Sequence, residues 1–286
     1  MNSIGDRLRH AAAALADAGI DSPGLEARLL MAHVLGVDRT SLLDRGQNID
    51  PAAFDAALSR RLAHEPLAFI IGRQGFWTLD LAVSPATLIP RADSETLISA
   101  AIAHAPTRPA AILDLGTGTG CLLLAALVEF PQAFGIGIDL APAAAALATR
   151  NAHDNGLAPR AAFLAGNWAT ALNGQFDLVL SNPPYIKAAD IPTLMPEVAE
   201  FEPSRALDGG PDGLDAYRAL AQALPALLTP TGIAVLELGQ GQAADVTAIA
   251  SAYGLASVAV VADLGGIPRA LVLKPQKTFG SGDTDG

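Results

Sequence analysis

The sequence contains little cysteine and little basic charge. A single cysteine, Cys121, leaves no possible intrachain disulfide, and the five histidines are scattered along the 286 residues. No cluster has the spacing of metal ligands, so we predict no metal site. Acidic residues outnumber basic residues by 29 to 18, which gives a net charge of −11. Such a surface repels phosphate backbones, and we therefore predict no nucleic-acid partner.

Long apolar runs are also missing. No run approaches the roughly 20 residues that a helix needs to span a bilayer. The first residues, MNSIGDRLRH, have no apolar signal-peptide core. We therefore expect a cytoplasmic protein with no membrane partner, and we expect it to be a monomer. The 51% of hydrophobic residues are enough for a sizeable core, divided between a main domain and a smaller companion.

The spacing of apolar residues changes twice along the chain. Residues 1–74 show helical spacing in three alanine- and leucine-rich stretches, which predicts a small helical domain. Residues 75–91, GFWTLDLAVSPATLIPR, alternate apolar and polar residues around Ser84 and Pro85, which predicts a β-hairpin linker with its turn there. The polar, glycine-rich residues 277–286 are expected to form a disordered tail.

Residues 92–276 alternate short strand-like runs with helical ones. Seven strand-like runs are present, beginning with AAILDLG and AFGIGIDL and ending with Arg269 to Lys274. This alternation predicts an α/β domain with a mostly parallel seven-stranded sheet and helices on both faces, a Rossmann-like architecture.

A glycine-rich turn follows the first of these strands, in ILDLGTGTG. Gly116, Gly118 and Gly120 allow the backbone to approach a ligand closely, and the helix that follows offers N–H groups at its first turn. Asp139 ends the next strand, where a carboxylate can accept both hydroxyls of a ribose. The alternative, without a ligand, is a tight strand-to-helix turn with Asp139 as a solvated strand end. Taken together, the loop and Asp139 resemble the S-adenosylmethionine site of class I methyltransferases.

The stretch FDLVLSNPPY places a stiff loop at the carboxyl end of another strand. Asn182, Pro183 and Pro184 form an extended segment rich in hydrogen-bond acceptors, because proline has no N–H and keeps the preceding residue out of the helical region. The Asn182 side-chain oxygen and a backbone carbonyl such as that of Pro183 can bind both hydrogens of a planar NH2 group, and Tyr185 can pack against it. This predicts methylation of such a group, although the loop alone allows adenine N6, cytosine N4 or a glutamine amide. A plain strand-ending turn is the structural alternative.

Further stretches resemble one family. The hairpin region GFWTLDLAVSPATLIPRADSET, the loop SNPPYI and the stretch FEPSRALDGGPDGLDAYR follow a helical N-terminal module in the order typical of the HemK/PrmC protein-(glutamine-N5) methyltransferases. The resemblance runs from about Ile4 to Lys274. It implies an enzyme that transfers methyl from S-adenosyl-L-methionine to the glutamine of the Gly-Gly-Gln loop in class I peptide chain release factors, which the helical domain helps to engage.

The resemblance also assigns roles to residues. It implies that Asn182, Pro183 and Tyr185 are catalytic and that Asn182, Pro183, Pro184 and Tyr185 bind the substrate glutamine. The cofactor-binding residues that it implies are Gly116, Thr117, Gly118, Thr119, Gly120, Asp139, Trp168 and Asn182. Trp168 would stack on the adenine and Asn167 would reach its edge, although many relatives carry aspartate at the position of Asn167.

Several assignments stay open at this point. An adenine-N6 methyltransferase acting on DNA or RNA would share the loop chemistry, and a non-catalytic module that binds S-adenosylmethionine is a third possibility. Arg91, Asp93 and Glu95 either border the active-site mouth or belong to a helix start, with Asp93 or Ser94 as its N-cap. Glu237 either lies on the cofactor side of the sheet or is an ordinary charged strand end. Asp263 and Arg269 are expected to support the final hairpin.

Overall fold

The computed structural model describes residues 3–37, 42, 50–106, 108–168, 170 and 172–276. Its α-helices are α1 (Ile4–Asp17), α2 (Pro23–Leu35), α3 (Pro51–Leu62), α4 (Leu67–Ile71), α5 (Glu95–His104), α6 (Cys121–Glu129), α7 (Pro142–Asp154), α8 (Pro196–Ala199), α9 (Asp215–Leu227) and α10 (Ala243–Ala252). Its strands are β1 (Arg73–Phe76), β2 (Leu79–Ala82), β3 (Ala111–Leu115), β4 (Phe134–Asp139), β5 (Ala161–Ala165), β6 (Phe176–Ser181), β7 (Leu228–Glu237), β8 (Leu255–Ala262) and β9 (Pro268–Pro275). Short 3-10 turns cover Ala92–Ser94, Ala158–Arg160, Ile191–Thr193 and Ser204–Ala206. The predicted tail, residues 277–286, lies outside the described residues.

The chain forms two compact units, of which the first is helical. It comprises Met1–Arg73, Val83–Pro85 and Leu194–Glu202. Helices α1, α2 and α3 pack around a core that includes Leu15, Leu30 and Phe54. Pro23 and Pro51 open α2 and α3, as the sequence predicted, because the first helical position needs no N–H donor.

A buried arginine ties the late segment of this unit to its helices. Arg61 on α3 donates from Nε to Glu26 Oε2 at 2.6 Å and from Nη1 to Glu197 Oε1 at 3.2 Å. His64 Nδ1 also lies 3.0 Å from Glu197 Oε1. These partners stabilise the carboxylate of Glu197 and lower its pKa against the opposing effect of burial. The segment around α8 is therefore held by charge as well as by packing.

The second unit comprises Gln74–Ala82, Ala86–Thr193 and Pro203–Gly286, and it contains the large sheet. The strand order is β5-β4-β3-β6-β7-β9-β8. Strands β3 to β7 pair in parallel, and β9 runs antiparallel to both β7 and β8. This arrangement confirms the predicted α/β class with a mostly parallel seven-stranded sheet.

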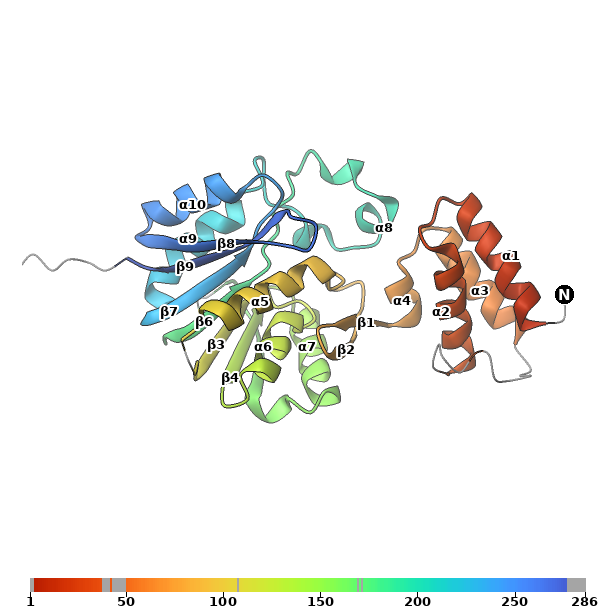
Figure 1. Ribbon diagram of the computed structural model, residues 1–286, viewed down its shortest axis with the longest axis horizontal. Helices are drawn as coiled ribbons and strands as arrows, with labels where there is room; N and C mark the ends of the chain where they lie inside the picture. The colour runs from red at the N-terminus through yellow and green to blue at the C-terminus, as the bar shows by residue number, and fades with distance from the viewer. Residues whose placement is uncertain are drawn as a thin grey trace, which may run out of the picture. The chain divides into compact units, whose positions relative to one another are not determined.

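Helices lie on both sides of the sheet (Figure 1). Side chains along each central strand alternate between two cores, one on each face. In β7, Ile233 and Val235 join the core that holds α5 and α6, whereas Ala234 and Leu236 join the core that holds α9 and α10. Both faces of the sheet are therefore buried, which explains why the strands appear in the sequence as nearly continuous apolar runs.

The predicted hairpin is present, but its turn is not at Ser84 and Pro85. Strands β1 and β2 form a two-stranded sheet joined at Trp77 and Thr78. Trp77 adopts a positive φ of 57°, and its backbone N–H donates to Glu95 Oε1 at 2.7 Å. Its indole Nε1 donates to Glu129 Oε1 at 2.7 Å. Tertiary hydrogen bonds thus fix the turn at Trp77, seven residues before the Ser84-Pro85 pair at which the sequence predicted it.

Candidate active site

A cavity of about 170 Å³ opens within the second unit, beside the carboxyl ends of the parallel strands. The strand order reverses between β3 and β6, and doubly wound sheets bind their ligands at such a switch point. The cavity is lined by residues 86–91, Ser94, residues 116–119, Cys121, Leu122, residues 138–140, residues 166–168, Asn182, Pro184, Arg205 and Ala206. Six separate segments of the sequence thus meet around one space.

The glycine loop after β3 is folded tightly against the end of β4. Gly116, Gly118 and Gly120 all have positive φ angles of 74°, 54° and 83°. A Cβ atom on Gly120 would lie 3.1 Å from the Ala148 side chain and 3.2 Å from the ring of Phe163. The N–H groups of residues 116 and 117 both donate to the Ile138 carbonyl at 2.9 Å. Several of the N–H groups that the sequence offered to a ligand are thus used within the protein, and the loop shapes the cavity wall instead.

Asp139 lies at the end of β4, where the sequence placed it, and its carboxylate is held by two backbone donors. Oδ2 accepts from the Gly118 N–H at 2.9 Å, and Oδ1 accepts from the Ala141 N–H at 2.9 Å. Each carboxylate oxygen can accept a further hydrogen bond. The geometry therefore leaves Asp139 rigid and able to accept from two neighbouring hydroxyl groups.

A second carboxyl group, that of Asp114, is buried beneath the glycine loop. It accepts from Thr117 Oγ1 at 2.6 Å, and burial raises its pKa to about 7. Its Oδ1 makes no hydrogen bond of ordinary geometry with any described residue, although the nearby Leu123 N–H lowers the pKa in opposition to burial. Asp114 thus braces the loop from inside the sheet. The buried hydroxyl of Thr119 likewise has no hydrogen-bond partner among the described residues, and it borders the cavity.

Trp168 and Asn167 lie in the cavity wall after β5. Trp168 has a positive φ of 48°, which is uncommon for a bulky residue, and its indole lies 3.9 Å from the point where a Cβ on Gly116 would be. The indole therefore borders the space above the glycine loop.

The loop after β6 places its four residues differently. Ser181 Oγ donates to the Leu115 carbonyl at 2.7 Å and ties the end of β6 to β3. Asn182 and Pro184 line the cavity, whereas Pro183 is buried and Tyr185 is partly buried outside the lining. Asn182 Nδ2 donates to Ser94 Oγ at 3.2 Å. The predicted residues are therefore adjacent, but only two of them reach the cavity itself.

The stretch DGGPDG, Asp208 to Gly213, holds the end of this loop in place, and we call it the clamp. Ile186 donates to the Leu207 carbonyl at 2.9 Å and accepts from the Gly209 N–H at 2.8 Å, in a parallel bridge. A Cβ on Gly209 would lie 2.8 Å from the Tyr185 Cα, and a Cβ on Gly213 would lie 2.5 Å from the Tyr185 carbonyl oxygen. Glycine is needed at both positions because the two segments touch backbone to backbone.

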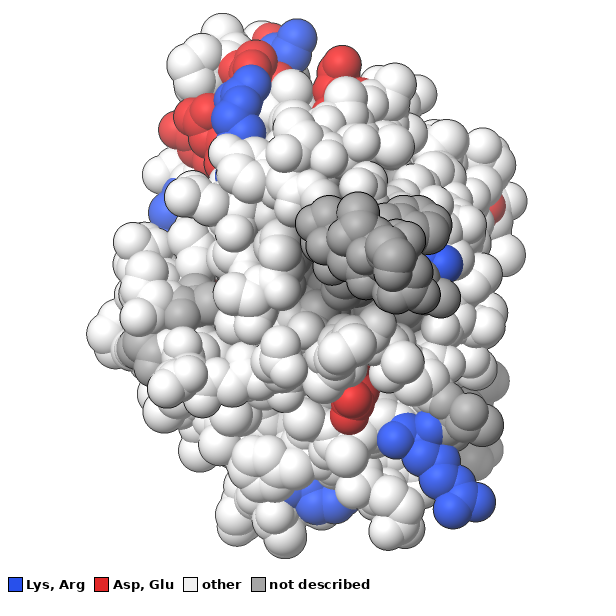
Figure 2. Space-filling model, turned by 90° about the vertical axis from the view of Figure 1, so that its left-hand side faces the viewer, with Lys and Arg blue, Asp and Glu red and all other residues white. Residues whose placement is uncertain are grey.

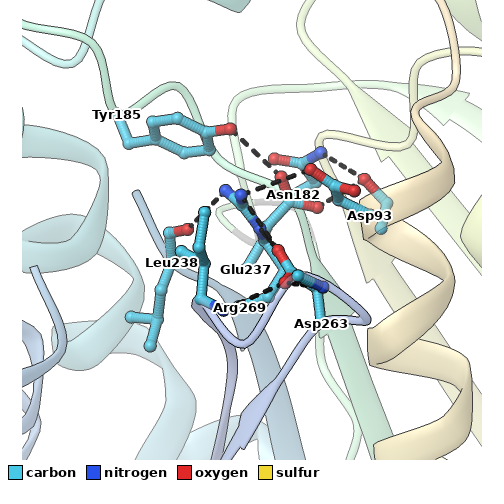
Figure 3. Close-up of polar contacts among 10 residues, drawn as sticks. Asp93, Asn182, Tyr185, Glu237, Leu238, Asp263 and Arg269 are labelled. Atoms are coloured by element: carbon cyan, nitrogen blue, oxygen red, sulfur yellow. Dashed lines mark hydrogen bonds and ion pairs between the residues drawn. The ribbon is translucent and has the colours of Figure 1, made fainter. Parts of the chain in front are cut away.

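Glu237 lies at the end of β7, and Asn182 and Tyr185 converge on it (Figure 3). The Tyr185 hydroxyl donates to Glu237 Oε1 at 3.2 Å, and the Ser94 hydroxyl donates to Oε2 at 2.5 Å. Burial raises the pKa of the Glu237 carboxyl, and the two donors and nearby Arg269 act in the opposite direction. Glu237 thus borders the active site. The sequence alone did not distinguish this position from an ordinary charged strand end.

Arg91, Asp93 and Glu95, at and just before the start of α5, have separate roles. Arg91 lines the cavity, Glu95 holds the hairpin turn at Trp77, and Asp93 pairs with Arg269 Nη2 at 3.3 Å. Neither Asp93 nor Ser94 caps α5 through its side chain. Ser94 does stand at the N-cap position of α5, one of the two alternatives predicted, but its hydroxyl is directed to Glu237 and makes no capping hydrogen bond.

The final hairpin is held as expected. Asp263 accepts from the N–H groups of Gly265 at 2.9 Å and Ile267 at 3.0 Å, and it pairs with Arg269. Arg269 also donates to the Leu238 carbonyl at 3.2 Å, so the hairpin is connected to the end of β7.

Two residues of the site, Ser94 and Asp114, were missed in the sequence. An aspartate within the apolar run AILDLG was a visible signal, since a charged residue at a buried strand position has to serve a purpose. Ser94 carried no such signal, because a serine before a helix is ordinary.

Comparison with known proteins shows the family. Residues 6–72 match the PrmC N-terminal domain, and residues 93–199 match the methyltransferase small domain. The chain is 49% identical to a release factor glutamine methyltransferase of Rhodospirillum rubrum over 95% of this chain and 85% of that protein. It is 45% identical to one of Cereibacter sphaeroides over 92% of this chain and 95% of that protein.

Solved structures support the fold alone. The crystal structure of a methyltransferase from Pyrococcus furiosus is 16% identical, with a TM-score of 0.54, and the match covers 77% of this chain and 98% of that one. The crystal structure of a ribosomal protein L11 methylase from Lactobacillus delbrueckii subsp. bulgaricus is also 16% identical, with a TM-score of 0.50, over 65% of this chain and 80% of that one. On the strength of its close sequence relatives, the chain belongs to the release factor glutamine methyltransferase family.

Proposed function

We propose that this protein transfers a methyl group from S-adenosyl-L-methionine to the side-chain amide nitrogen of the glutamine in the Gly-Gly-Gln motif of class I peptide chain release factors. The observation that supports this most directly is one cavity bordered both by the glycine loop with Asp139 and by Asn182 with Pro184. A cofactor site and an amide-binding loop that share one space are what a methyl transfer to an amide needs.

The residues around the cavity fit this cofactor. Asp139 can accept from the two ribose hydroxyls, because its backbone donors leave acceptor capacity on each oxygen. The Trp168 indole offers an apolar face for the adenine, and residues 116–119 bound the space for the methionine part. When bound, S-adenosylmethionine supplies an electrophilic methyl group on a positively charged sulfur.

The loop then prepares the amide nitrogen. An amide nitrogen is a poor nucleophile because its lone pair is delocalised into the carbonyl. In our proposal, the Asn182 Oδ1 and the Pro183 carbonyl accept hydrogen bonds from the two N–H groups of the substrate amide and favour a pyramidal nitrogen. Tyr185 packs against the amide plane. The nitrogen gains a bond to the methyl carbon, the bond between that carbon and sulfur breaks with its electron pair left on sulfur, and the cationic nitrogen loses a proton to water. Positioning and fixed dipoles supply the rate enhancement, without a general base.

The helical unit is proposed to help engage the release factor, and the active enzyme is proposed to be a monomer. Among the described residues, no helix has the length and apolar character to cross a membrane. On the face shown in Figure 2, the described basic side chains occur in small separate groups, of which the upper one lies beside acidic side chains. No continuous basic patch is visible there, which gives no support to a nucleic-acid substrate on that side.

The test is a methyl-transfer assay with labelled S-adenosylmethionine. The protein is incubated with a release factor, with the same factor carrying Gly-Gly-Ala in place of Gly-Gly-Gln, and with duplex DNA. Label is expected only on the Gly-Gly-Gln factor. Label on DNA would favour the adenine-N6 alternative, and equal label on both forms of the factor would refute the glutamine as the acceptor.

A further inference from the structure

Glu237 and Ser94 form a buried pair directly behind the amide-binding loop. Each side chain belongs to a residue that is only 2% exposed, and their oxygens lie 2.5 Å apart. Ser94 in turn lies 3.2 Å from the Asn182 amide. The chain of contacts therefore runs from a carboxylate at the end of β7, through one hydroxyl, to the side chain that lines the cavity.

The direction of these hydrogen bonds follows from the number of protons available. An ionised carboxylate only accepts, so the single hydroxyl proton of Ser94 is directed to Glu237. Ser94 can then only accept from Asn182, which places the amide nitrogen Nδ2 toward Ser94. The amide oxygen consequently faces away from Ser94. The two ends of an asparagine amide have nearly the same shape, so this chain is what distinguishes them.

The second oxygen of the same carboxylate holds Tyr185, whose hydroxyl donates to Oε1 at 3.2 Å. Tyr185 is fixed at its backbone as well, because its carbonyl accepts from Gln242 Nε2 at 3.1 Å. One buried carboxylate therefore contacts both polar side chains of the Asn-Pro-Pro-Tyr loop, directly or through Ser94.

We propose that Glu237 and Ser94 are positioning residues for the methyl transfer: through Ser94, the Glu237 carboxylate fixes the Asn182 amide with its oxygen toward the methyl acceptor. This rests on the proposed function, in which that oxygen accepts from the glutamine amide. With the Asn182 amide reversed, an NH2 group would face the NH2 group of the substrate, and two donors cannot pair.

A purely structural role explains the carboxylate poorly. Moving an ionised carboxylate out of water costs several kcal/mol, and well-packed apolar residues of similar volume often give equal or greater stability. The countercharge is also shared, since Arg269 pairs with both Asp93 and Asp263. The presence of the Glu237 carboxylate is therefore better explained by its effect on the loop, where it sets the direction of the hydrogen-bond chain, than by a contribution to stability.

The main test is Glu237→Gln, which keeps the shape of the side chain and adds a donor. The new NH2 group can donate to Ser94, whose proton is then free to turn toward Asn182 and favour the reversed amide. We expect kcat to fall about 100-fold, the scale of one lost preorganised polar contact, with KM for the release factor and Kd for S-adenosylmethionine within about threefold of wild type. A kcat within threefold of wild type would overturn the proposal.

Matched variants separate positioning from folding. Glu95→Gln alters a neighbouring carboxylate that accepts from the hairpin turn at Trp77, and it is expected to leave kcat unchanged. Tyr185→Phe breaks the other contact of Glu237 alone and measures its share. In an Asn182→Ala background, Glu237→Gln should lower kcat by less than threefold, because the amide through which it acts is gone. A loss there as large as in wild type would show that Glu237 acts by another route and overturn the proposal.

The pH profile provides a readout that a structural role would not change. Protonated Glu237 can donate to Ser94 and reverse the chain, so kcat of wild type should fall on the acid side. Because burial raises the pKa of Glu237, this fall should occur above the pH at which an ordinary glutamate titrates. The titratable and charged groups that face Glu237 are Asp93, Cys121, Tyr185, Tyr217 and Arg269. Asp93 is present in both wild type and Glu237→Gln, so its titration cannot explain a difference between their pH profiles.

The experiment is to measure kcat against pH for wild type and Glu237→Gln with the Gly-Gly-Gln factor. We expect the acid-side fall in wild type and its loss in the variant, and identical profiles would overturn the proposal. If wild type methylates the factor and the two proteins behave alike, this inference alone fails. If wild type does not methylate the factor at all, the proposed function fails first.

Discussion

The clamp on the active-site loop can be tested by adding one methyl group, in Gly213→Ala. Gly213 has a φ of +78°, and a Cβ there would lie 2.5 Å from the Tyr185 carbonyl oxygen and 2.8 Å from Gln242 Nε2. Gly254 has nearly the same φ, +77°, and a Cβ there would meet nothing within 4 Å. Gly254→Ala therefore reproduces the backbone strain of Gly213→Ala without the contact.

The magnitudes follow from this comparison. The left-handed backbone costs an alanine about 1 to 2 kcal/mol in either variant. In Gly213→Ala the new methyl group also displaces two hydrogen bonds of Gln242 Nε2, to the carbonyls of Tyr185 and Gly213, at about 1 kcal/mol each. The melting temperature of Gly213→Ala should then lie about 4 to 8 °C below that of Gly254→Ala.

The effect on turnover should differ more. To restore ordinary contact at 3.4 Å, the Tyr185 carbonyl has to retreat by about 0.9 Å, and a displacement of about 1 Å at a reacting site can lower the rate about 100-fold. We expect that loss in kcat for Gly213→Ala, measured with labelled S-adenosylmethionine below both melting temperatures, and near-wild-type kcat for Gly254→Ala. Equal kcat values for the two variants would refute the view that the glycines of this stretch position Tyr185.

Two further predictions concern stability. Arg61→Met removes one partner each from Glu197 and Glu26 and should lower the free energy of unfolding of the helical unit by about 2 to 3 kcal/mol in urea titrations. Arg60→Met, at a more exposed pair, should lower it by less than about 1 kcal/mol, and equal losses would contradict the buried bridge. Asp114→Asn should change the pH dependence of stability, because a carboxyl whose pKa is about 7 when folded and 3.8 when unfolded makes wild type progressively less stable as pH rises between those values, by about 4 kcal/mol in all. Stability curves of wild type and Asp114→Asn that run parallel from pH 4 to 7 would contradict this.

Much of the fold was predictable because its physical signals are local. Strands buried on both faces appear as apolar runs, and Pro23 and Pro51 mark the first turns of two helices. The hairpin turn was not predictable in this way, since Trp77 takes a positive φ that its distant partners Glu95 and Glu129 stabilise.

The site shows the same division. Asp139 and Asn182 follow their strands immediately, so their positions at one edge of the sheet could be predicted from the order of elements. Ser94 and Glu237 are 143 residues apart and approach through the fold, and nothing in either local sequence indicates the other. The direction of a hydrogen-bond chain depends on three-dimensional contacts, which a sequence pattern does not describe.

The bridge from Arg61 to Glu197 also has a consequence for synthesis. The helical unit includes Leu194–Glu202, so its first 73 residues leave the ribosome long before the segment that completes it. Until Glu197 emerges, 136 residues after Arg61, the guanidinium lacks one of its two carboxylate partners. The charge of Arg61 therefore stays only partly paired while most of the sheet is being synthesised. The helical unit reaches its final form only after Leu194–Glu202 has been added to the chain.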